Sequence, residues 1–295
     1  MSGLEELRHK LDSLGDLQSI VRTMKALSAA SVRQYERAQE ALTDYYRTVE
    51  LGLHVVLRRH PDIPEARRRG PARAAAVVFG SDHGLCGRFN EEIVGYVGER
   101  MAATPAGAGP FPVVAVGARV AEQLEESGQP VEGDYLTPSS SERITATVQQ
   151  LLLKIDEWQN ERAIDHVYVF YNRHPGGARY QPTGIQLLPV DLRRFRRLEE
   201  ASWPTRIPPT FTMAGEELLS ALLRQYFFVT LFRACAESLA AEHNSRLAAM
   251  QNAEKNIDER MGEVNGAYRR ERQGAITAEL LDVVSGFEAL TGGED

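Results

Sequence analysis

Cysteine and long apolar runs are both scarce in this sequence of 295 residues. The two cysteines, Cys86 and Cys235, are too few for a disulfide framework at this length, so we expect free thiols in a reducing compartment. The longest apolar candidates, such as Tyr226–Val229, fall far short of the ~20 residues that a bilayer span requires. We therefore expect a soluble protein that does not insert directly into a bilayer.

Excess positive charge is also missing. The chain has 34 Lys and Arg against 41 Asp and Glu, which gives a formal net charge of −7. Like-charge repulsion would oppose association with nucleic acid, so we expect no nucleic-acid partner. With 43% hydrophobic and 25% charged residues, the composition is typical of a globular protein and not of a disordered one.

Proline is confined to the middle of the chain. All 14 prolines lie between residues 61 and 209, and neither flank contains one. Because proline interrupts helices, this distribution predicts two long terminal helices around a globular middle. The expected domains are an N-terminal coiled-coil helix in 1–60, a globular domain in 61–209, and a C-terminal coiled-coil helix in 210–295 with a protruding apolar tip.

A heptad repeat runs through the first segment. One series of positions is apolar or aromatic everywhere except at Ser28, and a companion series is apolar at five of its eight places. The two series are Leu7, Leu14, Val21, Ser28, Tyr35, Leu42, Val49 and Val56, and Leu4, Leu11, Gln18, Lys25, Val32, Gln39, Tyr46 and Leu53. This repeat predicts a helix that packs against another through a continuous seam. The seam is polar near Gln18 and Lys25, so its partner must tolerate polar groups there.

The last segment carries the same signature. Apolar residues recur at alternating steps of three and four residues, and the pattern resumes after a shift of register. They are Leu247, Met250, Ile257, Met261, Val264 and Tyr268, followed by Leu280, Val283, Phe287 and Leu290. Two seams separated by one domain are most simply satisfied by an antiparallel coiled coil within the chain; pairing between two copies is the alternative.

The two terminal helices differ in length. At 1.5 Å per residue, residues 4–58 would span roughly 80 Å and residues 213–290 roughly 115 Å. If they pair antiparallel, residue 4 lies about opposite residue 267, and about 35 Å of the C-terminal helix projects alone. Only Glu279, Asp282 and Glu288 carry charge between residues 273 and 291. A lone helix this apolar needs a protein sleeve around it.

The middle of the chain alternates between strand and helix patterns. Strands are expected at Ala74–Phe79, Pro112–Val116, His166–Tyr171 and Tyr180–Leu188, the last two joined through Pro175–Gly177. Helices are expected at Asn90–Met101, at Ala118–Glu126, and from a capping box of Ser139 and Glu142 to about Glu157. The proline-rich stretch 189–210 is expected to form a rigid strap. The predicted class is α/β: a Rossmann-like open sheet plus an antiparallel coiled coil of the terminal helices.

A glycine-rich loop, Gly80–Asn90, follows a strand and precedes a helix, where phosphate-binding loops occur. Its glycines at 80, 84 and 87 fit neither common nucleotide-binding spacing, so nucleotide binding is disfavoured. Cys86 with His83 suggests a thiol nucleophile and its base, but neighbours on one turn seldom reach that geometry. A tight turn that positions a packed thiol is favoured. The histidines lack metal-ligand spacing, so we expect no metal and no cofactor.

Four basic residues form a positive sector on the first helix. They are Arg22, Lys25, Arg33 and Arg37, opposed within that span only by Glu36. A solvated helix face is the simplest interpretation. The alternative is an acidic element of a partner that runs beside the helix.

Three blocks of the sequence are similar to one protein family. They are Leu17–Leu27 (LQSIVRTMKAL), Ser81–Gly87 (SDHGLCG), and Glu237–Leu290, which contains ESLAAEH at 237–243, AMQNA at 249–253 and RQGAITAEL at 272–280. Together with the expected architecture they cover nearly the whole chain. The sequence thus resembles the gamma subunit of F-type ATP synthases, the central rotor shaft.

The resemblance implies a mechanical, non-catalytic subunit that couples ion flow across a membrane to ATP synthesis or hydrolysis. Its implied partners are the alpha and beta subunits of the catalytic ring, the epsilon subunit and the membrane c-ring. Its implied location is peripheral, on the cytoplasmic face of the bacterial inner membrane. The implied contacts with beta are Met24, Lys25, Arg272, Gln273 and Thr277. The implied bearing tip comprises Leu280, Val283, Val284, Phe287 and Leu290, and the implied structural loop contains Gly84, Cys86 and Gly87.

Some positions depart from the family pattern. Arg88 stands where the family usually has a glycine, and Gly15–Leu17 and Ser28–Ser31 also differ. Such departures would suit a divergent bacterial branch, for example the sodium-linked type, although the c-ring and not this subunit selects the ion. Two other classes stay open: a small-molecule enzyme that uses Cys86 and His83, and a free-standing scaffold that dimerises through both seams.

Overall fold

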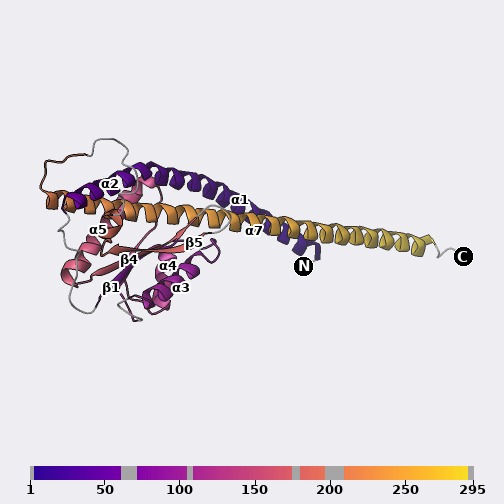
Figure 1. The fold of residues 1–295 in the computed structure, drawn as a ribbon. Coiled ribbons are helices and arrows are strands. Elements are labelled where there is room, and N and C mark those ends of the chain that lie inside the picture. Colours follow the sequence, from indigo (N-terminus) through magenta and orange to yellow (C-terminus); the bar gives the residue numbers. More distant parts are fainter. Residues whose placement is uncertain (1–2, 61–71, 105–108, 175–179, 197–208, 292–295) are drawn as a thin grey trace. The chain divides into compact units, whose positions relative to one another are not determined.

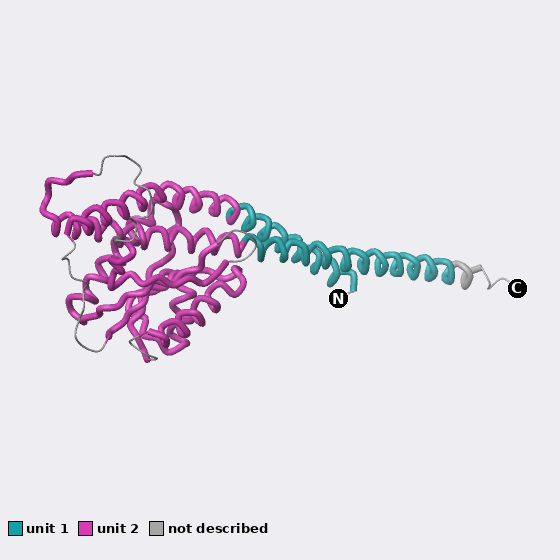
Figure 2. Tube along the Cα trace, in the orientation of Figure 1, with its two compact units in different colours: residues 1–27, 247–295 teal, residues 28–246 magenta. Residues whose placement is uncertain are grey.

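The computed structural model describes residues 3–60, 72–104, 109–174, 180–196 and 209–291, apart from the side chains of residues 196 and 287–291. The chain forms two compact units (Figure 2). The helical unit combines residues 1–27 with 247–295, and the sheet unit comprises residues 28–246. These units divide both long helices, whereas the three domains expected from the sequence follow the linear chain. That three-part division stays a prediction.

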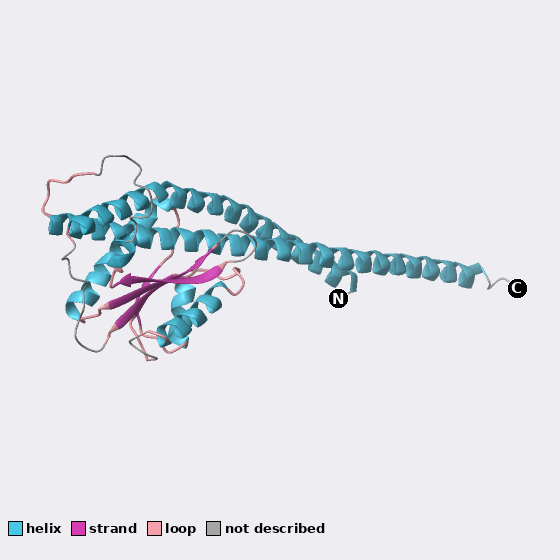
Figure 3. Cartoon of the chain, in the orientation of Figure 1, coloured by secondary structure: helices cyan, strands magenta, loops and turns pink. Residues whose placement is uncertain are grey.

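Helices dominate the described chain, and the strands all fall in its middle (Figures 1 and 3). The helices are α1 (Gly3–Ala41), α2 (Thr43–Arg59), α3 (Phe89–Ala102), α4 (Ala118–Glu126), α5 (Ser141–Glu161), α6 (Leu192–Arg196) and α7 (Gly215–Thr291). The strands are β1 (Ala74–Phe79), β2 (Val113–Val116), β3 (Val131–Tyr135), β4 (His166–Arg173) and β5 (Gln181–Leu188).

The strands form one sheet in the order β3-β2-β1-β4-β5. β1 pairs in parallel with β2 and β4, β2 pairs in parallel with β3, and β5 is antiparallel to β4. Parallel neighbours joined by crossover helices are the open-sheet arrangement that the alternating pattern predicts. The predicted α/β class with long terminal helices is confirmed.

Helices cover both faces of the sheet (Figure 1). Side chains alternate along β1, so Val77 and Phe79 pack into one core and Ala76 and Val78 into the other. The first core contains apolar residues of α5 and α7 together with Tyr35 of α1, and the second contains residues of α3 and α4. Because both faces are covered, β1 is buried throughout and reads as a continuous apolar run.

Two elements have the predicted bounds, and others were not predicted. β1 and α4 begin and end where the sequence pattern places them. The pattern misses β3, because this edge strand is half-buried and has the mixed sequence Val-Glu-Gly-Asp-Tyr. It also misses the short helix α6. Alternation of apolar and polar residues is a weak signal in short segments at the margin of a core.

Some predicted boundaries are wrong. The N-cap of α5 is Ser140 and not Ser139, and the Ser140 hydroxyl contacts the Glu142 carboxylate at 3.4 Å and does not cap a backbone N–H. α5 continues beyond Glu157 because its buried face extends to Trp158. The first helical segment is not continuous, since Leu42 separates α1 from α2. The Pro175–Gly177 turn and most of the 189–210 strap lie outside the described residues.

The predicted seam is confirmed by burial. Every position of both heptad series in α1 and α2 is buried or half-buried. α1 and α7 run antiparallel in each unit, because the residue numbers of contacting pairs rise on one helix as they fall on the other. The pairs are Gln18 with Asp258 and Arg22 with Glu254 in the helical unit, and Tyr35 with His243 and Gln39 with Glu237 in the sheet unit.

The surroundings of α7 change along its length. Residues 229–242 are buried except for the half-buried Arg233. The six predicted seam positions from Leu247 to Tyr268 are buried or half-buried, and every residue from 269 to 286 is exposed. One stretch of α7 is long and apolar enough to cross a membrane, but 44% of it is buried in the protein. Core helices of soluble proteins meet the same test, so this is weak evidence for a membrane span.

Candidate functional site

The last turns of α7 form the tip that the sequence predicts. Residues 269–286 give about 27 Å of helix that is exposed on all sides. Five apolar side chains there are 48% to 66% exposed: Ile276, Leu280, Leu281, Val283 and Val284. An exposed apolar surface of this kind is typical of protein interaction sites. Phe287 also lies on α7, as does Leu290, but their side chains are outside the described part of the structure.

The start of α1 lies close to its predicted place on α7. A Cβ added to Gly3 would lie 3.5 Å from Oε1 of Glu271. The expected partner of residue 4 is residue 267, so the observed register is within about one turn of the prediction. Beyond this point α7 has no seam with α1 among the described residues, which explains why its apolar side chains are uncovered.

The polar contact residues predicted on α7 lie just before the apolar tip. Arg272, Gln273 and Thr277 are all exposed. Thr277 Oγ1 donates a hydrogen bond to the carbonyl oxygen of Gln273 at 2.9 Å, so these two residues lie on adjacent turns of one face. The structure therefore brings Gln273 and Thr277 together and leaves Arg272 available for a partner beside them.

The predicted contact residues on α1, Met24 and Lys25, are half-buried. Lys25 Nζ forms an ion pair with Glu254 of α7, and Arg22 Nε donates to the same carboxylate at 3.1 Å. Hydrogen bonds from Lys25 and Arg22 hold the pKa of Glu254 below its usual value. The positive sector predicted from α1 is thus partly neutralised within the chain. The sequence did not reveal this, because Glu254 is more than 200 residues away.

A second apolar stripe on α1 was not predicted. Leu17, Ile20 and Leu27 are 50%, 55% and 64% exposed, and the half-buried Met24 continues the same spacing of three and four residues. The signal was present in the sequence as a second periodic series beside the seam. The stripe ends after about three turns, so it is a local surface suited to one partner element.

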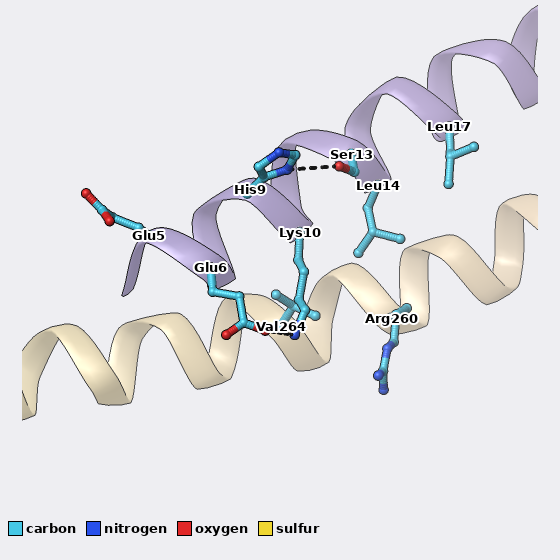
Figure 4. A pocket seen from close by; sticks show the side chains of 9 residues that line it. All are labelled: Glu5, Glu6, His9, Lys10, Ser13, Leu14, Leu17, Arg260 and Val264. Carbon is cyan, nitrogen blue, oxygen red and sulfur yellow. Dashed lines mark hydrogen bonds and ion pairs between the residues drawn. The ribbon is translucent and has the colours of Figure 1, made fainter. Parts of the chain in front are cut away.

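A shallow pocket lies along the seam of the helical unit (Figure 4). Its volume is about 460 Å³, and its lining includes Leu14, Leu17 and Val264. Leu14 points from α1 toward α7, while His9 and Ser13 are hydrogen-bonded to each other at 3.3 Å on the outer side. The pocket is open and mostly apolar at its base, which is typical of an incompletely filled coiled-coil seam and not of a catalytic cleft.

The glycine-rich loop is stabilised by hydrogen bonds of two of its own polar side chains, Asp82 and Asn90. Asn90 Oδ1 accepts from the backbone N–H of Ser81 at 3.0 Å, and Asn90 Nδ2 donates to Ser81 Oγ at 2.8 Å. The Asp82 carboxylate accepts from the N–H of Ala118, at the start of α4, at 3.0 Å, and from the N–H of Thr137 at 2.9 Å. An acidic side chain therefore lies at the N-terminus of α4, where the helix dipole favours negative charge.

The geometry of the loop argues against the enzyme hypothesis. Cys86 is 1% exposed, and its thiol lies near Ser81 Oγ at 3.6 Å and the carbonyl oxygen of His83 at 3.7 Å. Burial raises the pKa of this thiol, so it is not an activated nucleophile. The His83 side chain is exposed, and its ring is not among the recorded partners of Cys86. Both cysteines are free and buried.

Apolar contacts join the loop to α7 within the sheet unit. Cys86 and Phe89 form a buried cluster with Ala241, and the Tyr180 ring packs edge-on against Phe89 at 5.2 Å between ring centroids. The small side chain of Ala241 permits the close approach. In the part of the chain that the structure describes, no group of three His, Cys, Asp or Glu side chains is arranged to hold a metal ion.

Comparisons with known proteins agree with this architecture. A family model described as ATP synthase matches residues 3–290. The ATP synthase gamma chain of Syntrophus aciditrophicus is 31% identical over 296 residues, which cover 99% of this chain and 100% of that protein. The ATP synthase gamma chain of a Cyanothece species is 29% identical and covers 98% of this chain and 100% of that protein.

Solved structures share the fold. The rotor of the Euglena gracilis mitochondrial ATP synthase in rotational state 1 has a chain with a TM-score of 0.61 at 18% identity, covering 92% of this chain and 98% of that chain. In rotational state 3 the corresponding values are 0.64, 19%, 99% and 96%. The family match along nearly the whole sequence, together with a relative of 31% identity, shows that this chain belongs to the ATP synthase gamma chain family.

Proposed function

We propose that this chain is the central-stalk rotor subunit of an F-type ATP synthase and that it couples ion flow to ATP synthesis or hydrolysis mechanically. The observation that carries the proposal is the tip of α7, where residues 269–286 are exposed on all sides and present large apolar side chains. Such a surface is costly in water and is stabilised only when another protein surrounds it. Leu280, Val283, Val284, Phe287 and Leu290 would form the part that turns within that sleeve.

The proposed partners are the alpha and beta subunits of the catalytic ring, the epsilon subunit and the c-ring. Support comes from the fold shared with chains of rotor and OSCP/F1/c-ring assemblies of the Euglena gracilis enzyme. The chain would be peripheral, on the cytoplasmic face of a bacterial inner membrane. Its 31% and 29% identity to gamma chains is compatible with the divergent branch predicted from Arg88. Coupling to sodium stays a prediction.

The chain would act without catalysing a reaction. A stiff asymmetric shaft gives the catalytic sites around it different surroundings, and rotation exchanges those surroundings in turn. On α7, the exposed Arg272, Gln273 and Thr277 would form hydrogen bonds with beta. On α1, Met24 and Lys25 would meet an acidic lever of beta, and the stripe of Leu17, Ile20 and Leu27 extends that surface with apolar contacts.

The ion pair of Lys25 with Glu254 refines this proposal. An acidic partner would have to compete with Glu254 for Lys25, so the contact would be weaker than one with an unpaired lysine. The pair also keeps the half-buried seam polar at the place where the heptads contain Gln18 and Lys25. Substitution of Glu254 by Gln is therefore expected to increase the attraction between α1 and an acidic lever.

Copurification tests the proposal directly. A tagged chain should capture alpha and beta subunits at one copy per three of each. A double substitution Leu280→Lys with Val284→Lys should reduce capture severely, because it places charge inside the apolar sleeve. The matched control is Glu279→Lys, which places the same lysine at an exposed position that is already charged and reverses the sign of that charge. Absence of alpha and beta from the wild-type preparation, or equal capture by all three proteins, would refute the proposal.

The two other classes make different predictions. An enzyme based on Cys86 would lose turnover of a small substrate in Cys86→Ala while assembly stayed normal. A free-standing scaffold would be a dimer of the isolated chain in size measurements. The buried thiol of Cys86 does not favour an enzyme. The antiparallel pairing of α1 with α7 inside each unit does not favour a scaffold that dimerises through both seams.

A further inference from the structure

A buried arginine of α7 connects to the glycine-rich loop of the sheet unit. Arg246 Nη2 donates to the carbonyl oxygens of His83 at 3.1 Å and Gly84 at 3.3 Å, and Arg246 Nε lies 3.4 Å from the Gly84 oxygen. The neighbouring Ser245 Oγ donates to the carbonyl oxygen of Cys86 at 2.6 Å. One turn of α7 thus satisfies three backbone carbonyls of a loop that is about 160 residues away in the sequence.

A buried carboxylate holds this arginine in place. Glu242, one turn earlier on α7, pairs with Arg246 at 2.8 Å, and both side chains are less than a tenth exposed. The second carboxylate oxygen of Glu242 is buried and has no recorded hydrogen-bond partner. The pair is therefore not a surface ion pair: Arg246 Nη2 contacts both the Glu242 carboxylate and the two loop carbonyls, so the carboxylate holds the nitrogen that faces the loop.

The loop has a backbone conformation that needs support. Leu85 has φ of 63°, in the left-handed region that non-glycine residues rarely occupy, and Gly87 has φ of 65°. Leu85 is also 61% exposed, so burial of its own side chain does not stabilise this conformation. Strain of this kind persists only where the surroundings determine the backbone, and here the bonds from Arg246 and Ser245 lie on either side of Leu85.

We propose that Arg246 is a positioning residue for torque transmission: it locks the His83–Cys86 loop to α7 within the sheet unit, so that the sheet and residues 215–246 of this helix turn as one body. This inference rests on the proposed rotor function. A planar guanidinium suits the role because it can contact two carbonyls and a carboxylate at once in a fixed geometry. The apolar cluster of Cys86, Phe89 and Ala241 holds the loop close to α7, and Arg246 fixes its orientation.

The same helix offers a matched control. Arg233 Nε pairs with Glu237 at 2.7 Å, again at a spacing of four residues and again with a buried carboxylate. Glu237 also accepts from Gln39 of α1 at 3.1 Å. No recorded bond of Arg233 reaches the glycine-rich loop among the described residues. The two pairs therefore share their spacing and a buried carboxylate on α7, but Arg233 is 41% exposed and has no recorded contact with that loop, whereas Arg246 is 8% exposed and contacts it.

The first experiment compares Arg246→Lys with Arg233→Lys in the full-length chain and in the assembled complex. Lysine keeps the charge near Glu242 but lacks the fork that reaches both carbonyls. Amide hydrogen exchange of residues 83–88 should become about tenfold faster in Arg246→Lys and stay unchanged in Arg233→Lys. In vesicles, Arg246→Lys should keep its ATPase rate but pump fewer ions per ATP hydrolysed.

A charge-neutral double variant separates positioning from simple stability. Arg246→Gln combined with Glu242→Gln leaves no unpaired buried charge, so its thermal stability should exceed that of Arg246→Gln alone. Amide exchange of its loop should stay as fast as in Arg246→Lys, and the number of ions that it pumps per ATP should stay as low. If slow loop exchange and the normal pumping ratio both returned together with thermal stability, the Glu242–Arg246 pair would be only structural, and the proposal would be overturned.

The remaining outcomes are also decisive. Unchanged exchange in Arg246→Lys, equal effects in Arg233→Lys, or faster exchange with an unchanged pumping ratio would each overturn the inference. A failure of the rotor function is distinguishable, because the wild-type chain would then not assemble or pump at all. Exchange in the full-length chain alone would still test whether Arg246 fixes the loop.

Discussion

Two stretches of α7 have the same secondary structure and opposite surroundings. Residues 229–242 are buried on nearly all sides, whereas residues 269–286 are exposed on all sides. The buried stretch contains Ala234, Ala236 and Ala240, whose small side chains allow the sheet and the neighbouring helices to approach closely. The exposed stretch contains Leu and Val side chains with no cover from the chain itself. Apolar content alone therefore does not show which part of a helix forms the core.

The polar groups of the two stretches also differ in where their partners lie. In the buried stretch, Glu237 is paired with Arg233 and Glu242 with Arg246, so each buried charge has a partner within the chain. In the exposed stretch, the polar groups of Arg272 and Gln273 face outward. The comparison teaches that the first stretch has its partners inside the chain and determines the fold. The second stretch has no cover from the described part of the chain, which is why we propose that its partners lie outside it.

The largest effect is expected when a leucine is truncated to alanine, because the loss of unfolding free energy should differ strongly between the two stretches. Leu231 is fully buried in the core between the sheet and α7, so Leu231→Ala should reduce the free energy of unfolding by about 2–5 kcal/mol. Leu280→Ala, at an exposed position, should change it by less than about 0.5 kcal/mol. Denaturant unfolding of the isolated chain measures both. Equal losses would mean that the tip is packed against the chain.

A proline between the two stretches should act on the seam. Val264 is buried against α1, so Val264→Pro should break the paired helix at a cost of about 3 kcal/mol or more. Far-UV circular dichroism and assembly with alpha and beta measure the effect. Val264→Ala is the control, because it keeps the helix and loses only part of the packing. Normal helicity and assembly of the proline variant would contradict the coiled-coil assignment.

A smaller effect is expected from the polar residues beside the tip. Arg272→Ala combined with Gln273→Ala should weaken ring assembly or coupling by about 1.5–3 kcal/mol, the contribution of a charge-assisted hydrogen bond. The stability of the isolated chain should not change, because both side chains are exposed. Arg260→Ala, which removes an exposed arginine paired with Glu263, is the control. Unchanged ATPase activity and assembly in the double variant would defeat this prediction.

A pH dependence of stability is also expected in the sheet unit. Burial lowers the pKa of His243 to about 4, and its ring stacks on Tyr35 at 5.6 Å between centroids. Because the unfolded chain takes up a proton near pH 6.5 and the folded chain does not, stability should fall as the pH decreases from about 6.5 to 4. His243→Phe keeps a ring on Tyr35 and should lose this part of the decline. Parallel curves of melting temperature against pH for both proteins would contradict it.

A neighbouring carboxyl acts in the opposite direction. Burial raises the pKa of Glu242 to about 7, although Arg246 opposes the shift. This shift contributes stability that is present below about pH 4.5 and is lost as the pH rises toward 7, where the carboxylate that pairs with Arg246 forms. The His243→Phe comparison must therefore be made as a difference between two proteins, so that the Glu242 contribution cancels.

Much of the fold follows from periodicity in the sequence. The seven-residue repeat of α1 and α2 predicts most of their buried positions, because a helix with such a repeat buries mainly one face, but it misses the buried His54 and Leu57. The alternating middle predicts the parallel sheet, and β1 reads as buried because six apolar residues in a row require cover on both faces. The apolar tip follows from the unequal lengths of the two helices. The edge strand β3 was missed because a half-buried edge leaves a mixed pattern.

Less of the candidate site can be predicted from the sequence. SDHGLCG was identified as a structural loop, but neither Arg246 nor Glu242 was assigned to it, because no local spacing relates α7 to residues 83–86. The pairing of Lys25 with Glu254 was missed for the same reason, and so the positive sector of α1 looked less compensated than it is. The stripe of Leu17, Ile20 and Leu27 could have been found, since its spacing is periodic.

The helical repeats, the α/β class and the uncovered apolar end can all be predicted from the order of residues along the chain, because each depends on the local alternation of polar and apolar side chains. The charges that are neutralised and the carbonyls that accept hydrogen bonds become known only from the folded structure. Those contacts join residues about 160 to 230 positions apart, and the direction of a side chain across a packed interface is not encoded in any local pattern.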